Sequence, residues 1–203
     1  MQDRSFTKHI VVLPAKVTEG GAARNNAFAI LLREDGAKQH VILWSGLLSR
    51  LVGFLKVLFL LLHWRKERVL IHYGTFHSLL GSKVLSSLLI SRLIHSVLFR
   101  ASRRNLIFIE VNDLPYEQAH DLELPPNDLR NFDRLLFSIN SMYFVFASIE
   151  MSNYARSLYG IAPDRALYMI NGSWPVDGDV TNDHRQHDLD LAALSLVYAG
   201  TLN

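Results

Sequence analysis

The stretch LIFIEV, residues 106–111, decides the fold class of this chain. All of its residues except Glu110 are apolar, and β-branched and aromatic side chains predominate. Such a run is typical of a strand that is buried on both faces, as strands in parallel sheets are. The runs VVL, residues 11–13, and YFVFA, residues 143–147, have the same character.

Strands and helices are predicted in strict alternation along the chain. Short apolar runs predict strands at residues 9–13, 40–44, 69–73, 106–111, 143–147 and 166–170. Helical spacing predicts helices at residues 22–33, 47–66, 79–101, 128–141 and 150–158. This alternation favours the α/β class, with a doubly wound, mostly parallel, Rossmann-like sheet and right-handed crossovers.

The alternation stops after residue 174. Residues 175–192 are mostly polar and contain Pro and Gly, so they are predicted to form a linker or a long loop. Residues 193–203 contain the apolar run LSLVYA and are predicted to form the first strand of a new unit. The sequence thus indicates a main domain over residues 1–174 and the beginning of a second one.

Composition narrows the function classes. The chain has 203 residues, of which 49% are hydrophobic and 20% charged, which is enough apolar material for a sizeable core. A formal charge of +2 does not imply a nucleic-acid partner, and aromatic residues do not alternate with basic ones. The absence of cysteine excludes disulfides, thiolate zinc sites and a cysteine nucleophile. The polar N-terminus does not resemble a signal peptide, so a cytoplasmic location is expected.

One segment, residues 47–66, is unusually apolar. A membrane-spanning helix needs about 20 mostly apolar residues. Lys56 interrupts this segment, and the uninterrupted run of residues 57–62 is too short to span. We expect a buried or half-buried helix, and the alternative is a helix that rests on a membrane surface.

Ligands of open α/β sheets bind at the carboxyl ends of the strands, so the residues after each predicted strand are the candidates for a site. After the first strand, Gly20 and Gly21 open a helix whose free N–H groups attract phosphate or carboxylate, and Arg24 is placed to pair with such an anion. The dinucleotide fingerprint and the P-loop are both absent. The alternative is a glycine-rich turn without a ligand.

Polar residues also follow the third strand, in the stretch HYGTFHS. His72 and His77 are candidates for acid/base chemistry or for hydrogen bonds to a sugar hydroxyl. No third ligand is near in sequence, so no metal site is predicted. A structural polar loop is an equally good interpretation.

The stretch after the fourth strand, EVNDLPYEQ, is dense in polar residues. Glu110, Asn112, Asp113, Tyr116 and Glu117 all fall there. A carboxylate at a strand end is suited to act as a general base or to accept a hydrogen bond from a sugar hydroxyl. Asp113 could equally cap a turn before the Leu-Pro pair.

Two later strands are also followed by polar residues. Ser148 is predicted to be a helix N-cap, and Asn171 begins an Asn-Gly turn. The stretch NDHRQHD, residues 182–188, is interpreted as a solvated loop rather than a metal site.

Four stretches carry a resemblance to a known family. In chain order they are EGGAARN, residues 19–25; FASIEMSNYARSLYGI, residues 146–161; YMINGSW, residues 168–174; and LVYAGTLN, residues 196–203. Together they resemble the N-terminal half of a glycosyltransferase with two Rossmann-like domains, the GT-B architecture, in its large family 4. The central stretch, residues 110–130, looks like members that act in bacterial polysaccharide assembly.

The resemblance implies an acceptor-binding domain that works with a nucleotide-sugar donor and a glycan or lipid-linked acceptor, and with no further cofactor or metal. A C-terminal domain or partner subunit would supply most donor contacts, so we expect little activity from this chain alone. The resemblance implies a catalytic role for Asp113 and His77. It implies that six further residues bind substrate or phosphate: Gly20, Gly21, Arg24, His72, Asn112 and Asn171.

Two other readings stay open. One is a non-catalytic, membrane-associated or scaffolding module of the same fold, suggested by the apolar segments at residues 47–64 and 88–99. This interpretation also predicts that the protein contacts the inner face of the membrane. The other is a different Rossmann-like nucleotide enzyme, against which the absent fingerprint counts.

Overall fold

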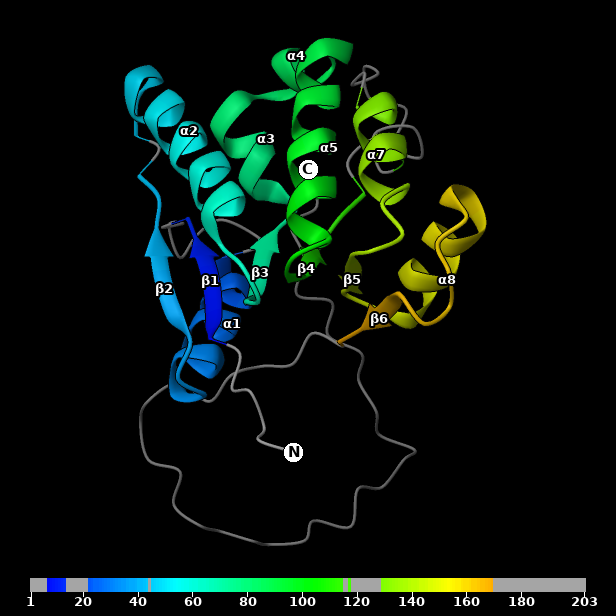
Figure 1. Cartoon of the computed structure of the whole chain (residues 1–203). Coiled ribbons are helices and arrows are strands. Elements are labelled where there is room, and N and C mark those ends of the chain that lie inside the picture. The colour runs from blue at the N-terminus through cyan, green and yellow to red at the C-terminus, as the bar shows by residue number, and fades with distance from the viewer. Residues whose placement is uncertain (1–6, 14–21, 44, 115–116, 118–128, 170–203) are drawn as a thin grey trace, which may run out of the picture.

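The computed structural model of the chain describes residues 7–13, 22–43, 45–114, 117 and 129–169 (Figure 1). Within these residues, six strands form one sheet in the order β2-β1-β3-β4-β5-β6. Every neighbouring pair is parallel. The strands are β1 (Lys8–Val12), β2 (Lys38–Val41), β3 (Arg68–His72), β4 (Leu106–Val111), β5 (Tyr143–Phe146) and β6 (Ala166–Tyr168). The predicted α/β class with a parallel, Rossmann-like sheet is confirmed.

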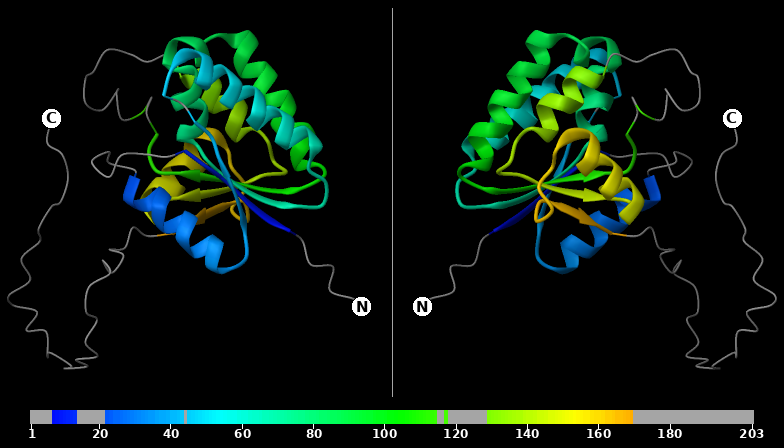
Figure 2. Two further views of the ribbon diagram at one scale, coloured as in Figure 1. Left: turned by 90° about the vertical axis from the view of Figure 1, so that its left-hand side faces the viewer. Right: turned by 90° about the vertical axis from the view of Figure 1, so that its right-hand side faces the viewer.

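Helices cover the two faces of the sheet unequally. They are α1 (Ala22–Glu34), α2 (Leu47–His63), α3 (Gly74–Leu80), α4 (Ser82–Leu85), α5 (Leu88–Ser102), α7 (Arg130–Phe137) and α8 (Ile149–Tyr159). Figure 2 shows α2, α3, α5 and α7 on one face and α1 on the other. Because β2 lies on one side of β1 and the later strands on the other, right-handed crossovers require this division.

The core follows the period of two that strands impose. Val69, Ile71, Ile107, Ile109 and Phe144 point to the helix-rich face and belong to the main hydrophobic cluster. The residues between them point to the α1 face. There Leu70 packs in a smaller cluster with Phe28 of α1, and Phe108 and Val145 lie against it.

Helix α2 approaches its neighbours closely at one position. A Cβ atom on Gly53 would lie 2.7 Å from Cγ2 of Ile42 and 3.1 Å from both the carbonyl oxygen of Leu43 and Cδ2 of Leu79. Glycine is therefore what lets α2 contact the chain just after β2 and helix α3 at this point.

The single helix predicted at residues 79–101 is wrong. This part of the chain forms α3, α4 and α5 instead, and α3 begins at Gly74, inside the stretch expected to be a polar loop. Gly81 has φ of 75°, which ends α3, and Ser87 is extended between α4 and α5. The other predicted helices and strands are present with shifted ends; α7, for example, ends at Phe137 rather than at residue 141.

The predicted cap of α8 is confirmed. The Oγ of Ser148 accepts a hydrogen bond of 3.1 Å from the backbone N–H of Met151, and Gly160 ends the helix with φ of 70°. The predicted linker at residues 175–192 and strand at residues 193–203 lie outside the described residues. Among the helices that are described, none has both the length and the apolar character needed to cross a bilayer.

Candidate functional site

In the sheet, β1 lies between β2 and β3, so the strand order reverses next to β1. Ligands of open α/β sheets bind at the carboxyl ends of the strands beside such a point. A pocket of about 210 Å³ lies at the carboxyl ends of β3 and β4. It is lined by residues from α1, β3, α3 and the chain after β4: Asn25, His72, Tyr73, Gly74, His77, Glu110, Asn112 and Asp113. Four of the residues predicted from sequence therefore meet in one pocket: His72, His77, Asn112 and Asp113.

A buried histidine–glutamate pair forms the floor of this pocket. His72 and Glu110 oppose each other in the ladder between β3 and β4, and Nδ1 of His72 lies 2.9 Å from Oε2 of Glu110. Both residues are almost completely buried, at 2% and 1% exposure. Since a carboxylate can only accept, Nδ1 carries the proton in this bond, and Nε2 of a neutral ring is left as an acceptor.

The second ring nitrogen of His72 is not used by the described part of the chain. Its Nε2 is buried and has no hydrogen-bond partner among the residues that the structure describes. The ring is held from the α1 side by Phe28, whose ring meets it edge-on at 6.1 Å between centroids. A buried acceptor nitrogen whose orientation is fixed by a carboxylate suits the removal of a proton from a bound hydroxyl.

Arg24 joins the site through the other oxygen of Glu110. Its Nε donates to Oε1 of Glu110, and its Nη1 donates to the carbonyl oxygen of Met169 at 2.7 Å. The guanidinium also lies 5.1 Å from the centroid of the Phe28 ring. Arg24 thus supplies the positive charge that a buried carboxylate needs, and it ties α1 to β4 and to the end of β6. Its predicted pairing with a ligand anion stays a prediction.

The rim of the pocket is formed by Asn112 and Asp113. Asn112 donates from Nδ2 to Oδ1 of Asn25 at 3.3 Å, which links the end of β4 to α1. Partial desolvation and, to a smaller extent, the charge of Glu110 raise the pKa of the Asp113 carboxyl group. Asp113 therefore holds a proton to a higher pH than an ordinary aspartate and can offer either a donor or an acceptor.

His77 lies on α3, one turn beyond Tyr73. Its Nε2 forms a hydrogen bond of 2.9 Å with Oγ of Ser82. Burial lowers the pKa of His77, so its ring is neutral at pH 7. It contributes a polar wall whose orientation is set by the start of α4.

Behind the pocket, a second pair of polar groups is buried among the helices. The hydroxyl of Tyr73 donates to Oδ1 of Asp133 at 2.6 Å. Burial raises the pKa of Asp133 to about 7, and the charge of Glu117 adds to this effect, while the bond from Tyr73 opposes it. The pair connects the beginning of α3 to α7 and so supports the pocket wall.

The remaining predicted residues cannot be placed. Gly20, Gly21, Asn171 and Tyr116 lie outside the described residues, as does the stretch at 182–188. Glu110 was predicted only as one of several polar residues after the fourth strand, and its pairing with His72 and Arg24 was not predicted, although it is the single acid in an otherwise apolar strand. Within the described part of the chain, no group of three or more His, Asp or Glu side chains is placed to hold a metal ion.

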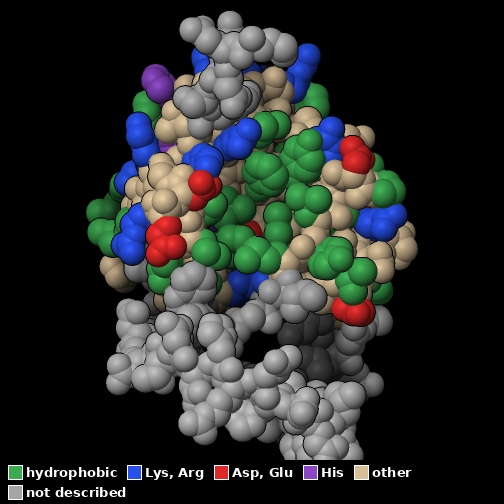
Figure 3. Space-filling model, turned by 90° about the horizontal axis from the view of Figure 1, so that it is seen from below, with side chains coloured by type: hydrophobic (Ala, Val, Ile, Leu, Met, Phe, Trp, Pro, Cys, Tyr) green, Lys and Arg blue, Asp and Glu red, His purple; other side chains and the backbone are tan. Residues whose placement is uncertain are grey.

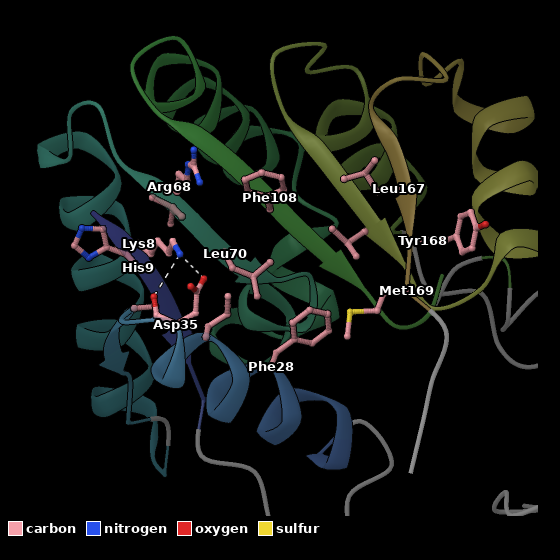
Figure 4. A pocket seen from close by; sticks show the side chains of 14 residues that line it. Lys8, His9, Phe28, Asp35, Arg68, Leu70, Phe108, Leu167, Tyr168 and Met169 are labelled. Carbon is pink, nitrogen blue, oxygen red and sulfur yellow. Dashed lines mark hydrogen bonds and ion pairs between the residues drawn. The ribbon is translucent and has the colours of Figure 1, made fainter. Parts of the chain in front are cut away.

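A larger hollow of about 490 Å³ lies on the α1 face of the sheet. Seen from below, hydrophobic side chains gather in the middle of this face, and charged side chains lie toward its margins (Figure 3). Phe28, Leu70, Phe108 and Leu167 point into it, and the ion pair between Lys8 and Asp35 lies at one end (Figure 4). Its lining is mostly apolar, and the charged residues Lys8, Asp35 and Arg68 line it together with His9.

Comparison with known proteins adds no family assignment. No protein-family model matches the chain, and no curated protein matches it significantly.

Proposed function

We propose that this chain is the acceptor-binding domain of a glycosyltransferase, which moves a sugar from a nucleotide-sugar to a glycan or lipid-linked acceptor in bacterial polysaccharide biosynthesis. The proposal rests on the resemblance of four stretches to the N-terminal half of GT-B enzymes. The observation that carries it is the pocket at the switch point of the sheet, with the buried pair of His72 and Glu110 at its floor.

The pair can handle the proton of an acceptor hydroxyl. In the proposed transfer, the acceptor oxygen forms a bond to the anomeric carbon of the donor sugar while the bond from that carbon to the diphosphate breaks. The hydroxyl proton passes to Nε2 of His72, and from there to solvent. Glu110 stabilises the imidazolium that forms and keeps Nε2 directed at the acceptor.

In this proposal the other residues of the site bind rather than transfer, which differs from the catalytic role that the resemblance implies for Asp113 and His77. Asn112, Asp113 and His77 offer hydrogen bonds to sugar hydroxyls around the reacting one. The resemblance assigns Gly20 and Gly21 to the donor phosphates or the acceptor, and Asn171 to substrate or phosphate binding. Arg24 is proposed to pair with an anion because it lies in the first turn of the helix that follows the two glycines. Most donor contacts would come from a C-terminal domain or a partner subunit, because the resemblance implies a cleft between two domains that closes over the substrates.

Acceptor binding can be tested on the chain itself by NMR titration with oligosaccharides and with water-soluble lipid-linked sugars. We expect the signals of the His72 ring and of the Asn112 amide to shift. His72→Gln keeps a donor for Glu110 but removes the ring acceptor, and it should weaken binding about tenfold, a change of about 1.4 kcal/mol. His95→Gln on α5 is the matched control. Shifts confined to other regions, or equal binding by both variants, would contradict the proposal.

Transfer provides the second test. The chain alone should turn over nucleotide-sugars slowly or not at all, because one domain presents only half of a closed cleft. Adding a separately produced C-terminal half should restore transfer. Robust transfer by the chain alone would show that the division of labour is wrong.

A non-catalytic, membrane-associated or scaffolding module is the second candidate. The observation that favours it is the large number of exposed leucines on α2 and α5. Nucleotide-sugar binding by the chain mixed with a C-terminal half would decide for the transferase. In either case we place the protein in the cytoplasm, at the inner face of the membrane.

A further inference from the structure

Helix α2 is apolar on its outer side as well as on its inner side. Its inner residues Phe54, Val57, Leu58 and Leu61 are buried in the main core. Its outer residues are exposed by 44% to 88%: Leu47, Leu48, Leu51, Val52, Leu55, Phe59 and Leu62. A helix that is apolar all round is normally enclosed on every side. Here one side has no cover from the residues that the structure describes.

Helix α5 continues this surface. It runs beside α2 on the same face of the sheet (Figure 1). Leu88, Leu89, Leu93 and Phe99 are exposed on it by 44% to 77%. We call the eleven exposed residues of the two helices the α2–α5 face. Exposed apolar side chains in this number on two adjacent helices indicate a site of interaction with a membrane or another macromolecule.

The segment of the chain that contains the α2–α5 face carries charges that are almost all of one sign. Residues 37–109 hold eleven Lys and Arg but only one acid, Glu67. The rest of the chain holds ten Lys and Arg and eighteen Asp and Glu. The small overall charge of +2 therefore hides a strongly basic segment that contains both helices. The guanidinium of Arg103, for example, lies 5.9 Å from the ring centroid of the exposed Phe99.

This combination selects one kind of partner. Exposed leucines interspersed with Lys and Arg, with no carboxylate on either helix, match the interface of a bilayer that contains anionic lipid. A second copy of the chain would bring two basic faces together, and the repulsion opposes such a dimer. Nucleic acid would match the charge but would gain little from aliphatic side chains.

We propose that the α2–α5 face docks on an anionic membrane surface, with the exposed Leu and Phe side chains inserted at the headgroup level and the basic side chains next to lipid phosphates. This contact does not depend on the transferase function. If that function is also correct, the docking has a consequence for the site. The first turn of α2 follows β2, so Leu47 and Leu48 lie at the same end of the sheet as the pocket, and a lipid-linked acceptor would reach the pocket from the bilayer.

Co-sedimentation of the full chain with vesicles tests the proposal. We expect binding to phosphatidylcholine vesicles that contain phosphatidylglycerol, and little binding to vesicles of phosphatidylcholine alone. High salt should weaken the binding, because it screens the basic side chains. Absence of binding to both vesicles would overturn the proposal, and equal, salt-independent binding to both would overturn its electrostatic part.

Surface variants locate the contact. The triple variant Leu51→Gln, Leu55→Gln and Phe59→Gln changes only exposed side chains and should lower the partition coefficient at least tenfold. Leu158→Gln on α8, exposed by 41%, is a control that should not change it.

The contribution of charge is tested separately. Arg92→Gln with Arg100→Gln should lower the partition coefficient about tenfold or more, since each basic residue near the surface contributes about 1 kcal/mol. Arg33→Gln with Arg134→Gln, on α1 and α7, is the matched control.

The absence of cysteine allows a direct readout of insertion. An environment-sensitive dye on Leu55→Cys should shift to the blue with anionic vesicles, whereas the same dye on Leu158→Cys should not. Circular dichroism of each variant checks that the fold is kept. If light scattering instead finds a dimer that the triple variant dissociates, the α2–α5 face is a self-association interface and the proposal is wrong.

Discussion

His72 and Glu110 face each other across two parallel strands, with Nδ1 of the imidazole 2.9 Å from one carboxylate oxygen. The other carboxylate oxygen accepts from Arg24, which is itself only 10% exposed in its side chain. Three elements, α1, β3 and β4, thus share one buried network of charge. Removing Glu110 leaves Arg24 and His72 buried without the carboxylate that both of them bind, which is a severe cost.

Glu110→Gln should destabilise the protein by about 3 kcal/mol, because the substitution leaves the Arg24 guanidinium buried without a countercharge. Urea unfolding measures this difference. The double variant with Arg24→Met removes both charges and should recover part of the loss. If Glu110→Gln alone costs less than about 1 kcal/mol, the pair is better solvated than its burial indicates.

Asp133 should make stability fall as pH rises from about 4 to 7. Its pKa is raised from 3.8 to about 7 in the folded protein, so the native state keeps a proton that the unfolded chain loses in this range. The penalty is absent below pH 4 and reaches about 4 kcal/mol above pH 7. Asp133→Asn keeps an acceptor for Tyr73 and removes this dependence, so it should be more stable than the unmodified protein at pH 8. Unfolding curves at several pH values check this, with the exposed Asp164→Asn as control.

Gly53→Ala should destabilise the protein by about 1 to 2 kcal/mol. The added methyl group would lie 2.7 Å from Cγ2 of Ile42, so α2 must move away from the core, and this outweighs the gain of up to about 1 kcal/mol in helix propensity. Gly74→Ala is the control, because nothing lies within 4 Å of its new Cβ. Thermal unfolding distinguishes the two variants, and an equal effect would contradict the close approach at Gly53.

Ser148→Ala should cost about 1 kcal/mol, since it removes the acceptor for the N–H of Met151 at the start of α8. Ser148→Asp keeps an acceptor and should retain most of the stability. Denaturant unfolding of both variants measures the difference. A loss shared equally by both would mean that the contribution of Ser148 is not its cap.

Much of the fold could be predicted because local pattern and tertiary environment agree. Runs such as residues 106–111 are apolar at every position except Glu110, and a sheet covered on both sides accommodates them. The division of the predicted helix at residues 79–101 could not be read from periodicity. Its apolar spacing is helical throughout, and only the positive φ of Gly81 shows that the chain turns there.

The site was predictable in part, for a topological reason. His72 ends β3 and Asp113 follows the end of β4. Parallel strands bring their carboxyl ends to one edge, so the shared pocket follows from the fold class. The partnership of Arg24 with Glu110 spans 86 residues and depends on how α1 lies against the sheet. Nothing in the local sequence around either residue encodes that contact.

The ladder position of the histidine–glutamate pair has a consequence for protein engineering. Since hydrogen bonding between β3 and β4 fixes the separation of the two side chains, the connecting segment after β4 can be exchanged without disturbing it. A library of segments grafted after β4 could therefore be screened for altered ligand preference while the imidazole stays in position.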